Sequence, residues 1–204
     1  MKITIIVEGK TEKAFMPHLR EFLKTRLSGN MPNLDPFPYH GHIPEGDRLS
    51  RVVTHLFQGR NASDHVIALT DVYTGITPPV FIDAQDAKNK MRGWVGQDPR
   101  FHPHVAQYDF EAWLLPYWLT IQRLAGHNRL APPGRPETVN HNNPPSHRIE
   151  EIFNSGGCRD SYVKPRDASR ILRQNDLLIT INQCTELKAL VNTILSVSGG
   201  NVIP

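Results

Sequence analysis

The feature that most constrains the fold is a run of apolar, mostly β-branched residues at the start of the chain, residues 2–7 with the sequence KITIIV. A strand that covers a core with one face alternates apolar and polar residues, whereas a continuous run is typical of a strand buried on both faces. Such strands occur mainly in parallel sheets, because the helices that connect parallel strands cover both faces. The run therefore predicts a central parallel strand.

Strand and helix patterns then alternate along the first 125 residues. After the first strand, Gly9 permits a sharp turn, and Thr11 is the expected N-cap of a helix in which Pro17 produces a kink or a late start. This alternation is typical of an α/β protein with a parallel sheet. We expect strands at 2–7, 37–42, 65–70 and 102–108, and helices near 11–27, 47–57, 83–94 and 110–119.

The remaining residues have a different character. Residues 126–147 contain five prolines together with Asn and His, which predicts a long exposed loop. Short helical patterns follow near 147–154, 167–174 and 186–196. We therefore expect an α/β core at 1–125, a Pro/Asn/His-rich loop at 126–147 and a helical C-terminal extension at 148–204 that packs on the core.

Composition excludes several classes of protein. The chain has 23 Lys and Arg against 20 Asp and Glu, so its net charge of +3 permits nucleic acid as a partner but does not require it. Cys158 and Cys184 form no close pair, which argues against a disulfide scaffold or a Cys-based zinc site. The apolar runs are too short for a secretory signal or a membrane span. We expect a soluble, cytoplasmic protein with no membrane partner, and its oligomeric state stays open.

Three acidic residues stand where predicted strands end. Glu8 follows the first strand, Asp71 follows the third, and Glu111 lies just past the fourth. The carboxyl ends of parallel strands meet at one edge of the sheet, where open α/β sheets bind ligands. Carboxylates gathered there repel one another, and Mg²⁺ relieves that repulsion. Any one of these acids alone is equally typical of the first turn of a helix, but three at one edge favour a functional site.

Five sequence blocks stand out: IIVEGKTE at 5–12, TDVY at 70–73, YDFEAWLL at 108–115, YVK at 162–164 and CTEL at 184–187. Together they resemble the bacterial family called domain of unknown function 4276. That family is similar to the Toprim fold of topoisomerases, primases and nucleases of the overcoming-lysogenization-defect type. The resemblance implies a Toprim-like, Rossmann-like core of four parallel strands. In Toprim enzymes a Glu after the first strand and an Asp-x-Asp after the third bind Mg²⁺ for phosphoryl transfer.

The match to the Toprim pattern is partial. Glu8 corresponds to the Toprim glutamate and Asp71 to the first Asp of Asp-x-Asp, but the second Asp is replaced by Tyr73. Glu111, or Glu12 one helical turn after Glu8, is the candidate for the missing carboxylate. We therefore predict Glu8, Asp71 and Glu111 as catalytic and metal-binding residues, with Mg²⁺ as the cofactor and Mn²⁺ as the alternative.

Two lysines are candidates for contact with a phosphate. Lys10 lies in the turn after the first strand, where it contacts a phosphate at the start of the helix or is simply solvated. Lys164 lies in the YVK block and reaches either the acidic residues, as an ion pair, or a phosphate. In this scheme Glu8 acts as general base or general acid, and Tyr73 or Tyr108, both at strand ends, lines the site.

The resemblance implies a Mg²⁺-dependent nuclease or phosphotransferase acting on nucleic acid, with DNA favoured over RNA. Members of this family are often encoded beside an ATPase and are associated with phage defence, so an ATPase partner is expected. The alternative is a non-catalytic Toprim-like module that binds a nucleotide, a nucleic acid or a partner protein, and Tyr73 is its main support. A weaker alternative is a small-molecule phosphohydrolase with Asp71 as nucleophile.

Histidines and arginines are the remaining candidates. The pairs His40/His42 and His102/His104 each place two imidazoles on one face of a strand, which can start a zinc site. No further ligand lies at a known zinc spacing, and structural or surface roles are favoured; His127, His141 and His147 are the other histidines considered. The arginines at 166, 170 and 173 share one helical face. They form either a modest stripe for a nucleic-acid backbone or a solvated surface.

Overall fold

A four-stranded parallel sheet forms the centre of the protein. The computed structural model describes residues 1–29, 31–39, 41–73, 75, 77–139, 143–157 and 161–204. The strand order is β2-β1-β3-β4 and all neighbours are parallel, which confirms the predicted α/β class and the inner position of the first strand. The strands are β1 (Lys2–Val7), β2 (Asn33–Pro38), β3 (His65–Asp71) and β4 (Phe101–Ala106).

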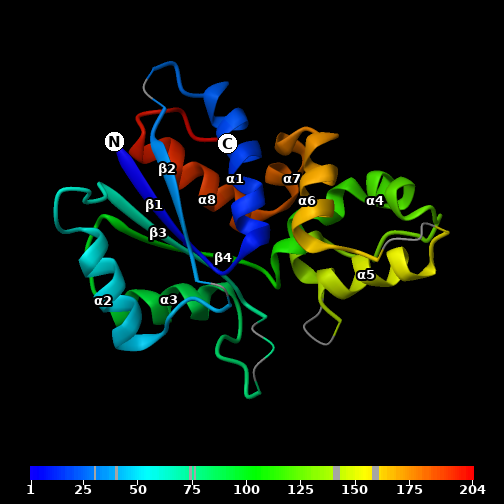
Figure 1. Ribbon diagram of the computed structural model, residues 1–204, viewed down its shortest axis with the longest axis horizontal. Helices are drawn as coiled ribbons and strands as arrows, with labels where there is room; N and C mark the ends of the chain where they lie inside the picture. The colour runs from blue at the N-terminus through cyan, green and yellow to red at the C-terminus, as the bar shows by residue number, and fades with distance from the viewer. Residues whose placement is uncertain (30, 40, 74, 76, 140–142, 158–160) are drawn as a thin grey trace.

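Helices cover both faces of this sheet (Figure 1). They are α1 (Lys10–Lys24), α2 (Gly46–Leu56), α3 (Ala84–Val95), α4 (Trp118–Ala125), α5 (Pro145–Ser155), α6 (Lys164–Arg173), α7 (Leu177–Gln183) and α8 (Thr185–Val197), with the 3-10 helices η1 (Phe110–Tyr117) and η2 (Pro136–Thr138). In Figure 1, α2 and α3 lie on one face, α1 and α8 lie on the other, and α4 to α7 gather beside the sheet. Among the described residues, no helix has both the length and the apolar composition of a membrane span.

The alternation of β1 explains the two hydrophobic layers. Ile3, Ile5 and Val7 point into the larger core, on the side of α1 and α8, whereas Ile6 points into the smaller core beneath α2 and α3. All four side chains are fully buried. Burial on both faces is the reason that the strand consists almost entirely of apolar residues.

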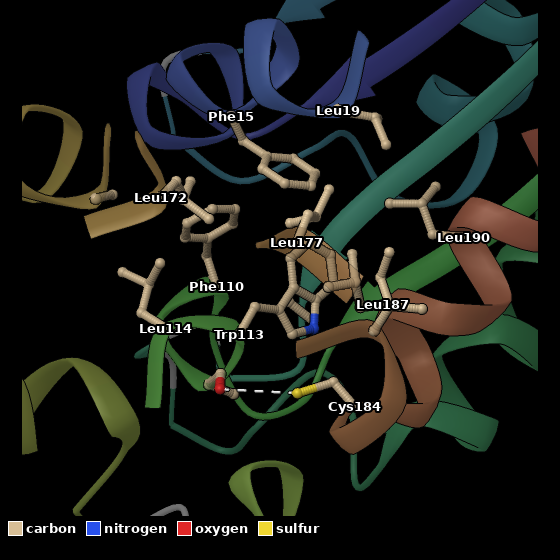
Figure 2. Packing of buried hydrophobic residues seen from close by; sticks show 14 of the residues in the cluster. Phe15, Leu19, Phe110, Trp113, Leu114, Leu172, Leu177, Cys184, Leu187 and Leu190 are labelled. Carbon is tan, nitrogen blue, oxygen red and sulfur yellow. Dashed lines mark hydrogen bonds between the residues drawn. The ribbon is translucent and has the colours of Figure 1, made fainter. Parts of the chain in front are cut away.

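The C-terminal helices share the larger core with the sheet and with α1. Figure 2 shows Phe15 of α1 against Phe110 and Trp113 of η1, with leucines of α6, α7 and α8 around them. The ring centroids of Phe15 and Phe110 lie 5.6 Å apart, and those of Phe110 and Trp113 lie 5.3 Å apart. Cys184 is buried at the edge of this cluster, with its Sγ 3.9 Å from the carbonyl oxygen of Ala112. These contacts fix the position of η1, which carries part of the site.

Several predicted boundaries are wrong. Helix α1 begins at Lys10 and continues through Pro17, and its N-cap is Gly9 rather than Thr11, because the Glu12 side chain accepts a hydrogen bond from the Gly9 N–H. Helix α2 begins at Gly46 instead of 47, with Glu45 as its N-cap and Asp47 in its first turn.

The remaining differences lie in β2 and the C-terminal third. Strand β2 covers 33–38 instead of 37–42; two prolines weakened its pattern, and an edge strand tolerates them. The 110–119 helix is a 3-10 helix followed by α4, α5 begins inside the predicted loop, and α7 was not predicted. The division of the chain at 125 and 147 stays a prediction.

Candidate active site

A small acidic cavity lies at the carboxyl edge of the sheet. Its volume is about 200 Å³. Glu8 directly follows β1, Asp71 is the last residue of β3, Glu111 belongs to η1 and Glu12 belongs to the first turn of α1; all four line the cavity. The three acids predicted from the strand ends therefore meet in one place. The rest of the lining comprises Gly9, Lys10, Thr11, Gly41, His42, Phe110 and Lys164.

Glu8 and Asp71 are held together by hydrogen bonds. The Glu8 Oε1 atom accepts one from the Asp71 backbone N–H, at 3.1 Å, and another from the Thr70 hydroxyl. The other oxygen, Oε2, lies 3.5 Å from His42 Nδ1. Burial raises the pKa of Glu8, and the repulsion of Glu12 adds to this, against the lowering effect of the two hydrogen bonds. Glu8 is thus oriented, but its charge is only partly compensated.

Asp71 has the least compensated charge in the cavity. Within the described part of the chain, its carboxylate accepts no hydrogen bond and forms no ion pair. Its pKa is raised well above the usual value, first by burial and then by repulsion from four other carboxyl groups. A cation placed at Asp71 would reverse these effects. The four groups are Glu8, Glu12, Asp109 and Glu111.

Glu111 is almost fully buried, with 1% of its side chain exposed. The Tyr162 hydroxyl donates to its Oε1 at 3.1 Å, and Lys164 Nζ lies 3.6 Å from its Oε2. Burial, followed by repulsion from Asp109, raises the pKa of Glu111 to about 8, although Lys164 opposes this. Burial also lowers the pKa of Lys164, but the acids around it, Glu111 first, outweigh burial and raise it. Lys164 is thus a fixed cation of the cavity.

The other predicted residues differ in their placement. Glu12 is buried, and its Oε2 accepts a hydrogen bond from the Gly9 N–H at 3.0 Å. It therefore caps the N-terminus of α1 as well as lining the cavity. Burial raises the pKa of Glu12. Lys10 is exposed at the mouth of the cavity. Tyr73 does not line it; its backbone N–H donates to the Tyr108 carbonyl at 2.7 Å.

Two functional candidates were missed from the sequence. Asp109 is 2% exposed; its Oδ2 accepts from the Ser146 N–H at 3.0 Å, and its Oδ1 has no partner among the described residues. Burial raises the pKa of Asp109. Tyr162 holds Glu111 as described. Both lie inside blocks that carried the family resemblance, which was the available signal, but Asp109 resembled a helix cap and Tyr162 a packing residue.

The donor set suits a hard divalent cation bound by few protein ligands. Within the described ranges, no three or more His, Cys, Asp or Glu side chains are arranged to hold a metal ion. Glu111 already contacts Tyr162 and Lys164, so the predicted three-carboxylate site stays a prediction. Mg²⁺, however, binds through one or two carboxylates and keeps several waters. Asp71 and Glu8, adjacent and undercompensated, fit that requirement.

The histidines on β4 have structural contacts. His102 Nε2 lies 3.1 Å from His65 Nδ1 on β3, and His104 Nε2 lies 3.0 Å from the Thr193 hydroxyl on α8. Burial is the main cause that lowers the pKa of His102 to about 4 and of His104 to about 3. The structural role that the sequence favoured matches these contacts. His40 and His141 lie outside the described residues.

Two arginines of the predicted basic stripe share one carboxylate on their own helix. Arg166 and Arg170 form ion pairs with Asp167 at 2.9 and 3.1 Å, while Arg173 borders a different hollow beside His18. The carboxylate of Asp167 is fully buried under the two guanidinium groups, so both arginines act in local structure. Both alternatives for the stripe, a contact with a nucleic-acid backbone or a solvated surface, stay predictions. Cys158 lies outside the described residues.

The sheet order, the helices on both faces and the acidic carboxyl edge define a Toprim-like α/β protein. The chain belongs to the family described as Domain of unknown function (DUF4276), whose model matches residues 7–195. A search of curated proteins finds no match to it.

Solved structures with the same fold include regions of two OLD proteins. The C-terminal region of the Burkholderia pseudomallei OLD protein has a TM-score of 0.55 and 15% identity, covering 96% of this chain and 98% of that one. The C-terminal region of the Xanthomonas campestris pv. campestris OLD protein, phased with mercury, has a TM-score of 0.50 and 14% identity, covering 97% and 96%. At these identities the similarity establishes the fold.

Proposed function

We propose that this protein is a Toprim-like, metal-dependent nuclease or phosphotransferase that acts on nucleic acid, with DNA favoured over RNA. The observation that carries the proposal is the environment of Asp71, whose carboxylate is repelled by four other carboxyl groups and has no hydrogen bond or ion pair among the described residues, with Lys164 as a more distant cation. Folding gathers these like charges at the edge where α/β sheets bind ligands. A cationic ligand accounts for that arrangement.

Asp71 and Glu8 are the residues that would hold the ion, Mg²⁺ or alternatively Mn²⁺. When bound, such an ion polarises a phosphate and lowers the pKa of its water. The hydrogen bond from the Asp71 N–H to Glu8 Oε1 keeps the two carboxylates adjacent. Glu111 was also predicted as a ligand; in the present proposal it acts instead through Lys164.

The remaining cavity residues have roles that follow from their contacts. Glu8 is the general base or acid, because Thr70 and the Asp71 N–H fix Oε1 and leave Oε2 facing the cavity mouth near His42. Lys164 Nζ, kept in place by Glu111, binds a phosphate oxygen of the substrate. Lys10, exposed at the same mouth, is the second phosphate contact.

The partner and the cellular role are further parts of this proposal. Both neighbours above are regions of OLD proteins, and the sequence resembles Toprim proteins of the overcoming-lysogenization-defect type. We therefore keep an ATPase partner and a role in phage defence as the expected context. The alternative is a non-catalytic binding module, which Tyr73 supports because it stands where Toprim enzymes have a second Asp.

The test is cleavage of supercoiled plasmid and single-stranded DNA with Mg²⁺ and with Mn²⁺. Wild type is compared with Glu8→Ala and Asp71→Asn, and with Glu21→Gln as a matched control, since Glu21 is an exposed acid of α1 far from the cavity. Titration calorimetry of Mn²⁺ into each protein measures ion binding separately.

The expected result is cleavage by wild type and the control, and loss of both cleavage and ion binding in the two cavity variants. Equal cleavage by wild type and Glu8→Ala would identify a contaminating nuclease and contradict the proposal. Ion binding without cleavage would direct the search to the partner ATPase. Neither ion binding nor cleavage would favour the non-catalytic module.

A further inference from the structure

A second, larger hollow lies beside the acidic cavity. It is formed by the segment after β2 and by the first two turns of α2, and its volume is about 900 Å³. His42 lines both hollows, so they are adjacent. This residue follows the carboxyl end of β2, which is Pro38. The proposed reaction uses none of the other residues in this hollow.

One side of the hollow offers a surface for a flat ring. Tyr39 lines it, half-buried, with its ring centroid 5.7 Å from that of the exposed Phe37. Ile43 and Val52 add apolar surface. A nucleobase stacks on an aromatic side chain of this kind whatever its sequence, because every base has a π face.

Two arginines stand on another side. Arg48 and Arg51 are one turn apart on α2, both are exposed, and neither forms an ion pair with a residue that the structure describes. This distinguishes them from Arg166 and Arg170, which both form an ion pair with Asp167. Unpaired guanidinium groups beside an aromatic surface match the phosphates that flank a stacked base.

Two acids complete the lining and limit what the hollow accepts. Glu45 is the N-cap residue of α2 and Asp47 lies in its first turn, where the helix dipole favours negative charge. They offset the two arginines, so the hollow lacks the excess positive charge of a groove for a long backbone. Carboxylates also accept hydrogen bonds from the amino groups of bases. The lining thus suits one nucleotide.

We propose that this hollow binds an unpaired nucleotide of the substrate, next to the phosphodiester that lies in the acidic cavity. The base stacks on Tyr39, and Arg48 and Arg51 contact its phosphates. Stacking on a side chain requires a base that has left the duplex, so the protein prefers single-stranded substrate or an unpaired end. The substrate class rests on the proposed function; the binding site rests on the hollow itself.

The test measures binding without cleavage. A fluorescein-labelled single strand of about 10 nucleotides is titrated in EDTA, by fluorescence anisotropy over a range of salt concentrations. The proteins are wild type, Arg48→Ala/Arg51→Ala, Tyr39→Leu and Tyr39→Phe. Arg60→Ala is the matched control, because Arg60 is an exposed arginine in the turn after α2, outside the lining of the hollow. Circular dichroism confirms that each variant is folded.

The arginine and tyrosine substitutions are expected to affect different quantities, the salt dependence of binding and the affinity. Loss of two phosphate contacts lowers the slope of log Kd against log salt by about 1.4 for a single strand. Tyr39→Leu weakens binding about fivefold or more and leaves that slope unchanged. Tyr39→Phe and Arg60→Ala bind as wild type does. A blunt duplex of the same sequence binds more weakly and is insensitive to Tyr39→Leu.

The proposal is overturned if wild type shows no binding at low salt, if Arg60→Ala lowers the slope as much as the double variant, or if the duplex matches the single strand. The outcome is independent of the cleavage assay. Metal-dependent cleavage with unchanged binding in these variants refutes this inference alone. The expected binding pattern without any cleavage or ion binding refutes the nuclease proposal alone.

Discussion

Two groups of buried titratable side chains lie at different places on the same sheet. The acids at the carboxyl edge have raised pKa values, and the β4 histidines His102 and His104 have lowered ones. Burial is the first cause in both groups, and in both it favours the neutral form. The groups differ in what their polar atoms meet. His102 and His104 each have one hydrogen-bond partner that suits a neutral ring, His65 and Thr193, while the buried Nδ1 of His104 has none among the described residues.

Most of the acids also accept hydrogen bonds, as Glu8, Glu12 and Glu111 do, so the difference lies in their mutual proximity. They converge on a cavity, and Asp71 faces only like charges apart from the more distant Lys164. A perturbed pKa is therefore an ambiguous sign of function when taken alone. The contrast teaches that like charges converging on one cavity mark the candidate site, whereas a perturbed pKa without such convergence marks packing.

The largest effect is expected from a substitution that removes one charge from the acidic cavity. Asp71→Asn should lower metal-dependent cleavage by at least about 100-fold, while Glu21→Gln leaves it unchanged. In EDTA the same substitution should raise Tm by about 2–6 °C, because it removes a repelling charge. Calorimetry in EDTA and in Mg²⁺ measures both. A lower Tm in EDTA would show that the charge of Asp71 is compensated after all.

The next effect tests the histidine group. His104 has a folded pKa of about 3 against an ordinary value of 6.5, so between these values the unfolded chain binds more protons. Its contribution to stability is therefore present at neutral pH and is lost as pH falls. When the pH falls from 6.5 to 4.5, the free energy of unfolding should drop by about 2 kcal/mol less in His104→Gln than in wild type. Urea unfolding at both pH values measures this.

The exposed His55 on α2 supplies the matched control for that measurement. His55→Gln should leave the wild-type pH dependence intact. If both histidine variants behave alike, the neutral state of His104 does not contribute to folding as the comparison requires.

A smaller effect of opposite sign tests Glu111. Its folded pKa of about 8 exceeds the ordinary 4.5, so the folded chain binds more protons between these values. Its contribution to stability is present at low pH and is lost as pH rises toward 8. In EDTA, the free energy of unfolding of wild type should fall by about 1–2 kcal/mol when the pH rises from 6.5 to 8.0. The buried histidines stay neutral throughout this pH range. Glu111→Gln should abolish that loss, and an unchanged slope would contradict the assignment.

The smallest effect separates burial from charge. Lys88 pairs with Glu186 at 2.9 Å and contributes to the lowered pKa of His104, after burial and His102. Lys88→Met should raise the pKa of His104 by less than about one unit, since burial is the larger cause. Titration of the His104 ring by NMR checks this. Charging of His104 near pH 6 in the variant would show that Lys88, rather than burial, keeps it neutral.

The sequence predicted the parts of the fold that depend on local patterns. Burial on both faces gives β1 a continuous apolar run, and burial of one stripe gives α2 apolar residues at i, i+3 and i+4. Both patterns can be recognised in the sequence. Strand β2 was displaced because two prolines interrupt it. Helix α7 has seven residues and was missed, because so short a helix leaves little periodicity.

The same division holds for the site. Glu8 and Asp71 were found because each ends a parallel strand, and parallel strands carry their ends to one edge of the sheet. Glu111 was found because it lies just past the fourth strand, and the YVK block added Lys164, with an ion pair to the acids as one of two alternatives. The hydrogen bond from Tyr162 to Glu111 joins residues 51 positions apart in the sequence. It forms only because α1 and η1 pack against α6.

The sequence by itself determined the α/β class, the central strand and the meeting of acids at one edge, since these depend on residue type and on the order of strands and helices. The tertiary structure alone decided which charges are compensated. Only folding sets Lys164 against Glu111 and leaves Asp71 among like charges. Folding also brings His104 into hydrogen-bond distance of Thr193 and places Arg48 and Arg51 in one hollow with His42. Burial and distance set electrostatic energies, and neither can be read from positions along a chain.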